Sequence, residues 1–147
     1  MIVYFDTSAL LKAYVQEAGS KEIIALLDEG DNLFGSIALT KVEMASAIQR
    51  AVRAVGVSSS VAADAWQDFI EDWESFTRLR VTTGTIEKAS DLAWKYGLRG
   101  YDSLHLAAAL LWQENLGVKV TFAAFDHDLW QAGQKAGLEA WPHGLVS

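Results

Sequence analysis

Short apolar runs alternate with helix-like segments along the whole chain, and this alternation restricts the fold more than any other pattern. The runs that predict buried strands are Ile2–Phe5, Leu33–Ile37, 79–81, 118–122 and 138–141. Segments with helical spacing of apolar residues lie between them: 8–15, a segment after Gly19, 40–56, a segment carrying Trp66 to Phe76, 85–96, 102–115 and 126–136. Because parallel strands need crossover connections, usually helices, the pattern predicts an α/β fold with a parallel sheet. No repeat or linker interrupts it, so we expect residues 1–147 to form a single domain.

Four acidic residues stand where a strand or a loop is expected to lead into a helix: Asp6, Glu43, Asp102 and Asp126. Asp6 directly follows the first predicted strand, and Asp126 lies a few residues beyond the fourth. Functional sites of parallel sheets form beyond the carboxyl ends of the strands, so these side chains are expected at one mouth. Clustered carboxylates in a chain without cysteine favour a hard cation such as Mg²⁺ or Mn²⁺.

Helix capping is the competing explanation for each of these acids. Thr40 and Glu43 have the spacing of a capping box, and Asp6, Asp102 and Asp126 could each be an N-cap. Taken one at a time, capping is the simpler explanation. Taken together, all four junctions carry a carboxylate, although a Ser or Thr would cap a helix equally well. Helix N-termini also stabilise several anions held close together, because their dipoles present positive charge. The set therefore favours a metal site.

Composition limits the other possibilities. With 147 residues, 51% of them hydrophobic, the chain can bury a proper core and is not a disordered protein. The absence of cysteine excludes disulfides and thiolate metal sites. The chain has no signal-peptide pattern, and the apolar run 104–112 is too short to cross a bilayer, so we expect a soluble, cytoplasmic protein with no membrane contact. The net charge of −7 argues against nucleic-acid binding, unless bound cations reverse the local field.

An aromatic stripe marks the predicted helix in the middle of the chain. Trp66, Phe69, Trp73 and Phe76 recur on one side at helical spacing, together with Ile70. Packing into the core is the favoured explanation, and a partner surface is the alternative. The acids on the opposite side of this helix are expected to be solvated.

Four segments carry a resemblance to a known family: residues 5–10 (Phe-Asp-Thr-Ser-Ala-Leu), 40–43 (Thr-Lys-Val-Glu), 101–109 (Tyr-Asp-Ser-Leu-His-Leu-Ala-Ala-Ala) and 125–129 (Phe-Asp-His-Asp-Leu). In order and spacing they resemble PIN-domain nucleases, especially the toxins of VapBC toxin–antitoxin pairs. The resemblance implies a three-layer α/β/α sandwich around a mainly parallel sheet of four to five strands.

The resemblance also implies an activity and partners. The chain would be a Mg²⁺- or Mn²⁺-dependent endoribonuclease in which a metal-activated water hydrolyses RNA phosphodiesters. Asp6 and Asp102 would bind the metal directly, while Glu43 and Asp126 would bind it through waters. A VapB-like antitoxin would block the site, and the protein would form a homodimer.

Several further residues are candidates for supporting roles. Ser8 and Thr7 could orient Asp6 or simply cap the first helix, and Arg99 could contact phosphate or pair with an acid. The family often has a Ser or Thr two residues before the fourth acid, where this chain has Ala124, so Asp128 is a rival to Asp126.

Two histidines and several cations also lie near these segments. His105 follows Asp102 by three residues, and a packing role is favoured for it, as a lone histidine in an apolar helix is usually packed. The role of His127, in packing or in the site, is likewise left open by the sequence. Lys12, Lys41, Arg50 and Arg53 could contact the RNA backbone, although a solvated helix face explains any one of them more simply.

Three other functions stay open. The same nuclease could act in RNA processing outside toxin–antitoxin systems. An inactive domain could use the acidic mouth to bind a basic peptide. A phosphotransfer enzyme with Asp6 as nucleophile would need a second aspartate at position 8, where Ser8 stands, so this alternative ranks low.

Overall fold

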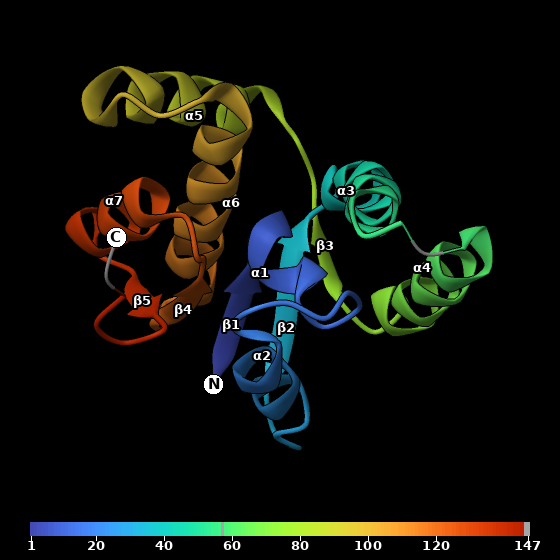
Figure 1. Cartoon of the computed structure of the whole chain (residues 1–147). Helices are drawn as coiled ribbons and strands as arrows, with labels where there is room; N and C mark the ends of the chain where they lie inside the picture. The colour runs from blue at the N-terminus through green and yellow to red at the C-terminus, as the bar shows by residue number, and fades with distance from the viewer. Residues whose placement is uncertain (57, 146–147) are drawn as a thin grey trace.

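A computed structural model of the chain describes residues 1–56 and 58–145 (Figure 1). Its strands are β1 (Ile2–Phe5), β2 (Leu33–Ile37), β3 (Thr77–Leu79), β4 (Val120–Ala123) and β5 (Glu139–Trp141). Its helices are α1 (Thr7–Leu11), α2 (Ser20–Leu27), α3 (Thr40–Ala54), α4 (Ser59–Trp73), α5 (Thr83–Tyr96), α6 (Gly100–Leu116) and α7 (His127–Ala136). The strands form one five-stranded sheet in the order β3-β2-β1-β4-β5, and all neighbouring strands are parallel. The predicted parallel α/β fold is confirmed.

Helices cover both faces of the sheet, which gives three layers (Figure 1). Successive residues of a strand point to opposite faces, and β1 follows this rule. Val3 and Phe5 pack into a core with α1, α2, α3 and α4, whereas Tyr4 packs on the other face with α6 and α7. The predicted α/β/α sandwich is therefore confirmed, with β1 at its centre and buried on both faces.

The aromatic stripe lies in the first of these cores. Phe69, Trp73 and Phe76 are buried, and Trp66 and Ile70 pack against them half-buried. The core explanation of the stripe is confirmed. No helix in the described part of the chain is long and apolar enough to cross a membrane.

Several element boundaries differ from the predictions. β3 pairs Thr77 and Leu79 with β2, two residues earlier than predicted, because a tight turn between Trp73 and Phe76 ends α4 early. Residues 80–82 then lead into α5. Thr82 is the N-cap of this helix, and its side chain accepts a hydrogen bond from the Thr85 amide. Similarly, α6 begins at Gly100 rather than at Asp102, and β4 is 120–123 rather than 118–122.

Gly35 in β2 is required by close packing. A Cβ atom there would lie 2.6 Å from the Trp112 ring of α6 and 3.1 Å from the Thr77 carbonyl oxygen. Gly35→Ala is therefore expected to lower the free energy of unfolding by about 1–3 kcal/mol, as overpacking of a tight core does. Urea denaturation measures this, with Gly30→Ala as control because nothing lies within 4 Å of a Cβ at Gly30. Equal stability of the two variants would contradict the packing.

The topology fixes where a site can form. From β1 the chain runs to β2 and β3 on one side, then crosses to β4 and β5 on the other, so the strand order reverses beside β1. Ligands bind in the crevice beyond the carboxyl ends of the strands at such a switch point. The Asp6 amide donates to the Ala123 carbonyl over 3.1 Å, which keeps the ends of β1 and β4 together.

Candidate active site

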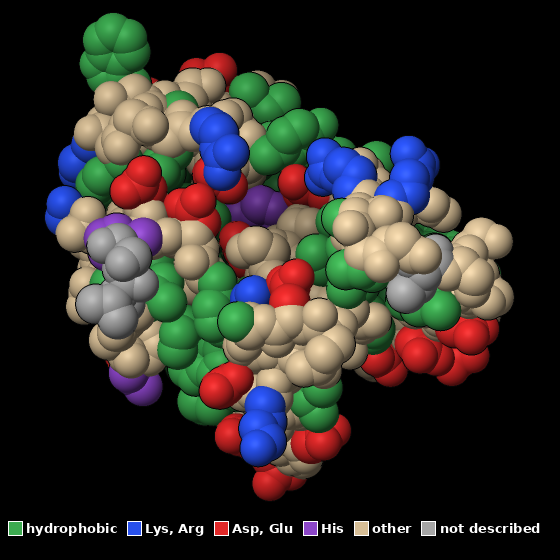
Figure 2. Space-filling view, viewed as in Figure 1, with side chains coloured by type: hydrophobic (Ala, Val, Ile, Leu, Met, Phe, Trp, Pro, Cys, Tyr) green, Lys and Arg blue, Asp and Glu red, His purple; other side chains and the backbone are tan. Residues whose placement is uncertain are grey.

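A cavity of about 510 Å³ opens beside these strand ends, and Figure 2 shows acidic side chains and a histidine gathered at its hollow. Its lining includes all four predicted acids, Asp6, Glu43, Asp102 and Asp126, together with Thr7, Ser8, Arg99 and His105. The acids come from the end of β1, from α3, from α6 and from the residue before α7. Four segments far apart in sequence thus meet at one mouth.

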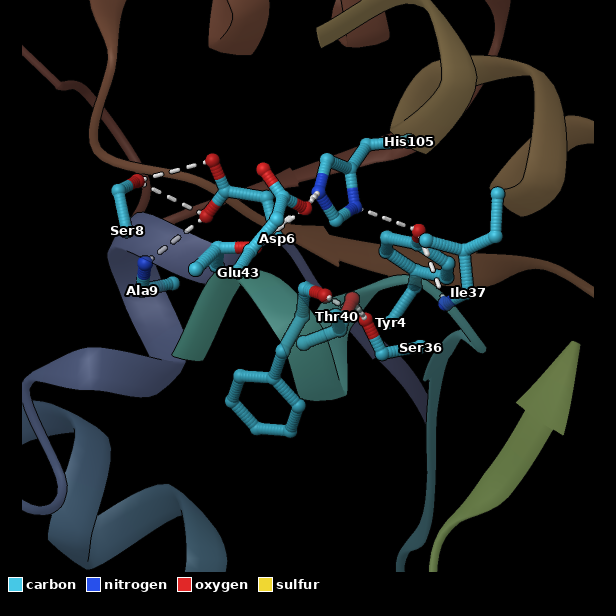
Figure 3. Close-up of polar contacts among 11 residues, drawn as sticks. Tyr4, Asp6, Ser8, Ala9, Ser36, Ile37, Thr40, Glu43 and His105 are labelled. Atoms are coloured by element: carbon cyan, nitrogen blue, oxygen red, sulfur yellow. Dashed lines mark hydrogen bonds and ion pairs between the residues drawn. The ribbon is translucent and has the colours of Figure 1, made fainter. Parts of the chain in front are cut away.

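Asp6 is the most deeply buried of these acids, with only 3% of its surface exposed. Its Oδ1 accepts a hydrogen bond from the Ala9 amide at 2.8 Å, and the Ser8 hydroxyl donates to Oδ1 at 2.9 Å and Oδ2 at 2.8 Å (Figure 3). Burial raises the pKa of Asp6 from its usual 3.8 to about 6, and the nearby charge of Asp102 acts in the same direction. Among the described residues, Asp6 forms no ion pair with a Lys, Arg or His.

Glu43 is held by His105 and Thr7. Its Oε1 accepts from the Thr7 hydroxyl at 2.8 Å and lies 2.8 Å from Nε2 of His105 (Figure 3). Burial acts to raise the pKa of Glu43, but the hydrogen bond and charge of His105 and the Thr7 hydroxyl outweigh it, so this pKa is lowered. Glu43 is therefore an ionised, oriented carboxylate.

His105 is oriented in turn by Tyr4. The Tyr4 hydroxyl lies 2.7 Å from Nδ1 of His105 and accepts from the Ile37 amide at 3.2 Å. Because a carboxylate only accepts, Nε2 carries the proton donated to Glu43, and in the neutral ring Nδ1 accepts from Tyr4. Burial raises the pKa of the Tyr4 phenol, which keeps that donor protonated. The result is one chain of contacts from β1 through α6 to α3.

The capping explanations have different outcomes. Asp6 and Asp126 do cap helices, since they accept from the amides of Ala9 and Leu129. The capping box around Glu43 is wrong, because Leu39 is the N-cap of α3 and makes no side-chain cap bond. The Thr40 hydroxyl instead lies 2.6 Å from that of Ser36, and its side chain does not cap the helix (Figure 3). Asp102 is no N-cap either, because Arg99 holds that position and Asp102 lies in the first turn of α6.

Arg99 links two of the acids. Its Nε lies 3.2 Å from Oδ2 of Asp102, and its Nη2 lies 3.5 Å from Oδ2 of Asp126. The Arg99 side chain is 80% exposed, so these pairs add little to stability and the guanidinium is accessible from solvent. Of the two roles considered for Arg99, pairing with acids is the one present in this structure.

Two other candidates lie outside the cavity. The Asp128 side chain is 89% exposed, and within residues 1–56 and 58–145 its ion pair is with His127, at 3.9 Å. His127 stacks on Trp130. Neither Asp128 nor His127 lines the cavity, so the geometry favours Asp126 over its rival.

Packing was the favoured role for His105, and Tyr4 was not among the predicted site residues, yet the structure connects both to Glu43. His105 is 2% exposed, as a packed residue would be, yet both ring nitrogens are engaged by site residues. Its position one turn after Asp102 was the available signal, because residues three apart share a helix face. Tyr4 had no signal, since it reads as an ordinary residue of an apolar strand.

The donor set fits a hard divalent cation. Four carboxylates line the cavity, the chain has no thiolate, and the imidazole of His105 is already engaged. The buried Asp6 also lacks a cationic partner, which a bound ion would supply. Among the described residues, no group of three or more acids and histidines is already arranged to hold a metal, and Arg99 lies between Asp102 and Asp126.

The fold and the cavity define a parallel α/β protein with a carboxylate-rich site at the switch point of its sheet. Residues 3–133 match the PIN domain family, and the chain belongs to that family. Two ribonucleases of Mycobacterium tuberculosis, VapC45 (strain CDC 1551 / Oshkosh) and VapC49 (strain ATCC 25618 / H37Rv), are each 36% identical to it over 109 residues. The match covers 74% of this chain and 75% of each relative.

Solved structures share the fold at lower identity. The toxin–antitoxin complex from Klebsiella pneumoniae matches with a TM-score of 0.59 and 17% identity, over 84% of this chain and 86% of that chain. FitAcB from Neisseria gonorrhoeae matches with a TM-score of 0.61 and 17% identity, over 91% and 94%. VapBC2 from Rickettsia felis, bound to a DNA fragment from its promoter, matches with 0.57 and 13%, over 86% and 88%. The predicted PIN-like fold is confirmed.

Proposed function

We propose that this protein is a Mg²⁺- or Mn²⁺-dependent endoribonuclease that acts as the toxin of a type II toxin–antitoxin pair. The observation that carries the metal site is Asp6, a buried carboxylate without an ion pair among the described residues, in a cavity with three other acids. The relatives named ribonucleases support RNA as the substrate. The net charge of −7 would repel RNA, and a cation bound at the acidic mouth would reverse the local field there.

The roles of the residues follow from their contacts. Asp6 and Asp102 would hold the cation directly, and Glu43 and Asp126 would hold its hydration shell. The cation, when bound, supplies charge neutralisation on the phosphodiester and activation of water. Ser8 fixes both oxygens of Asp6.

The remaining residues of the cavity have supporting roles. Thr7 and His105 fix Glu43 through their hydrogen bonds to its Oε1. Arg99 is exposed at the mouth, so its guanidinium can leave the acids and meet a phosphate oxygen.

The partners are proposed on the same basis. Two solved structures that share this fold are a toxin–antitoxin complex and VapBC2. We therefore propose a VapB-like antitoxin as the partner that blocks the acidic mouth, and a homodimer as the assembly. Co-purification of a small partner encoded beside the chain would distinguish this role from RNA processing by the same residues.

Removal of the metal tests the function. Purified protein should cleave total cellular RNA with Mg²⁺ or Mn²⁺, lose the cleavage in EDTA and regain it when Mn²⁺ is added in excess. The same ions should raise the melting temperature, because a ligand that binds only the folded state stabilises it. No cleavage together with no cation effect on melting would refute the metal site and favour the peptide-binding alternative.

A further inference from the structure

A second cavity continues the acidic one along α3. Its volume is about 390 Å³, and Leu39, Val42 and Ser46 contribute to its walls. The two cavities share five lining residues, which are Thr7, Glu43, Ala47, Arg50 and Tyr101. They therefore form one furrow that begins at the acids and extends along α3.

One face of α3 lines this furrow. Glu43, Ser46, Ala47 and Arg50 are spaced three, four and seven residues apart, so they lie on the same side of the helix. The small side chains of Ser46 and Ala47 leave room for a ligand. Seven residues of helix place Arg50 about 10 Å from Glu43 along the axis. A stacked strand carries a phosphate about every 3.4 Å, so this distance corresponds to a phosphate a few nucleotides away.

The charges on α3 suit a polyanion although the protein is acidic. The helix carries Lys41, Arg50 and Arg53 against the single acid Glu43, whereas the neighbouring α4 carries acids and no cation. Figure 2 shows the basic side chains gathered over α3 and the acidic ones over α4. Within the described chain, Arg50 has no ion-pair partner, so its guanidinium is not neutralised by a neighbour.

Tyr101 flanks the furrow from the start of α6. It lines both cavities, it precedes Asp102 directly, and 59% of its surface is exposed. In the part of the chain that the structure describes, its hydroxyl makes no hydrogen bond. An exposed aromatic ring beside an arginine without an ion-pair partner among the described residues is suited to a single-stranded nucleic acid. An unpaired base can stack on the ring while the guanidinium contacts the backbone.

We infer that the furrow binds a single-stranded RNA segment next to the cleavage site, with Arg50 on a backbone phosphate and Tyr101 stacked on an unpaired base. This inference rests on the proposed ribonuclease function and assigns two residues, Arg50 and Tyr101, as contacts to its RNA substrate. A base held in a duplex is stacked on its neighbours and cannot reach Tyr101. The furrow thus selects loops and single strands over helices.

Binding of defined oligonucleotides tests the inference. Fluorescein-labelled single-stranded RNA of twelve nucleotides, and a duplex of equal length, would be titrated against the Asp6→Asn protein, with strand integrity checked on a gel. Single-stranded RNA should bind at least tenfold more tightly than the duplex. Arg50→Ala should weaken single-strand binding about tenfold and reduce the slope of log K against log salt by about 0.7, the value for one phosphate contact.

Matched variants separate the contacts from general effects. Arg53→Ala removes the same charge from the same helix, but Arg53 does not line either cavity, so affinity should change less than twofold. Arg50→Lys should keep the salt slope. Tyr101→Ala should weaken single-strand binding about tenfold, while Tyr101→Phe should retain it because stacking needs only the ring.

Three outcomes would overturn the inference: equal losses in Arg50→Ala and Arg53→Ala, unchanged RNA affinity in Arg50→Ala, or equal affinity for single strand and duplex. Unchanged affinity would mean that the furrow serves a protein partner instead. Cleavage by the wild-type protein is measured separately. A failure to cleave would refute the proposed nuclease, while the binding data still decide whether the furrow holds RNA.

Discussion

Asp6→Asn is expected to abolish metal-dependent cleavage and, at the same time, to stabilise the metal-free protein. The substitution keeps an oxygen that can accept from the Ala9 amide, so the cap of α1 survives. It removes the negative charge that would hold the cation, and we expect activity to fall by at least a hundredfold. Rates of RNA cleavage in Mn²⁺ measure the first effect, and urea denaturation in EDTA measures the second.

The gain in stability follows from the raised pKa of Asp6. Raising this pKa from 3.8 to about 6 in the folded protein corresponds to about 3 kcal/mol of destabilisation at pH 7, where the buried group is charged. Between pH 6 and pH 4 the folded state binds the proton more tightly than the unfolded state does. The Asp6 contribution therefore makes the wild type more stable as the pH falls through 6, and this contribution is absent from Asp6→Asn.

The difference in unfolding free energy between the two proteins isolates Asp6. The advantage of Asp6→Asn in EDTA should be largest at pH 7 and shrink towards pH 4. Asp128→Asn is the matched control, because it also removes one acid but from an exposed side chain outside the cavity. An Asp6→Asn protein that cleaves like the wild type would remove Asp6 from the site, whatever its stability.

The second large effect is expected from His105→Ala, because His105 is a positioning residue for Glu43. Its loss removes the 2.8 Å contact to Glu43 and removes the acceptor of the Tyr4 hydroxyl proton. We expect a tenfold to hundredfold loss of activity or Mn²⁺ affinity, the usual effect of removing a group that orients a metal ligand. The buried Tyr4 hydroxyl would still accept from the Ile37 amide, but its O–H would have no acceptor, which should also cost about 1–3 kcal/mol of stability.

Two readouts separate positioning from packing. His105→Gln keeps a side-chain donor for Glu43 and should recover part of the Mn²⁺ affinity, measured by titration of folded protein. Tyr4→Phe keeps the Glu43–His105 contact and should lose stability with a smaller loss of Mn²⁺ affinity. If His105→Ala binds Mn²⁺ and cleaves like the wild type, with only a lower melting temperature, then His105 is merely a packed residue.

The predicted elements show what local pattern can settle. Apolar runs and helical spacing predicted the parallel sheet and its layers. Burial of a strand or of one helix face requires apolar residues at the spacing of that element, and this spacing is visible in the sequence. Boundaries were less accurate where pairing decides them. β3 lies at Thr77–Leu79 because those residues pair with β2, although the apolar pattern favoured residues 79–81.

The sequence by itself determined the fold class and the acids that lie where strands lead into helices. Both follow from the spacing of apolar residues and from the residues next to each acid, which are local properties of the chain. It left Glu43 between a capping role and a site role, and it favoured packing for His105. Tertiary structure excluded the capping box and brought Thr7 and His105 to Glu43 across 36 and 62 residues of chain. Arg50 of α3 and Tyr101 of α6 likewise line the same two cavities only in the folded protein, and such proximity leaves no local pattern in the sequence.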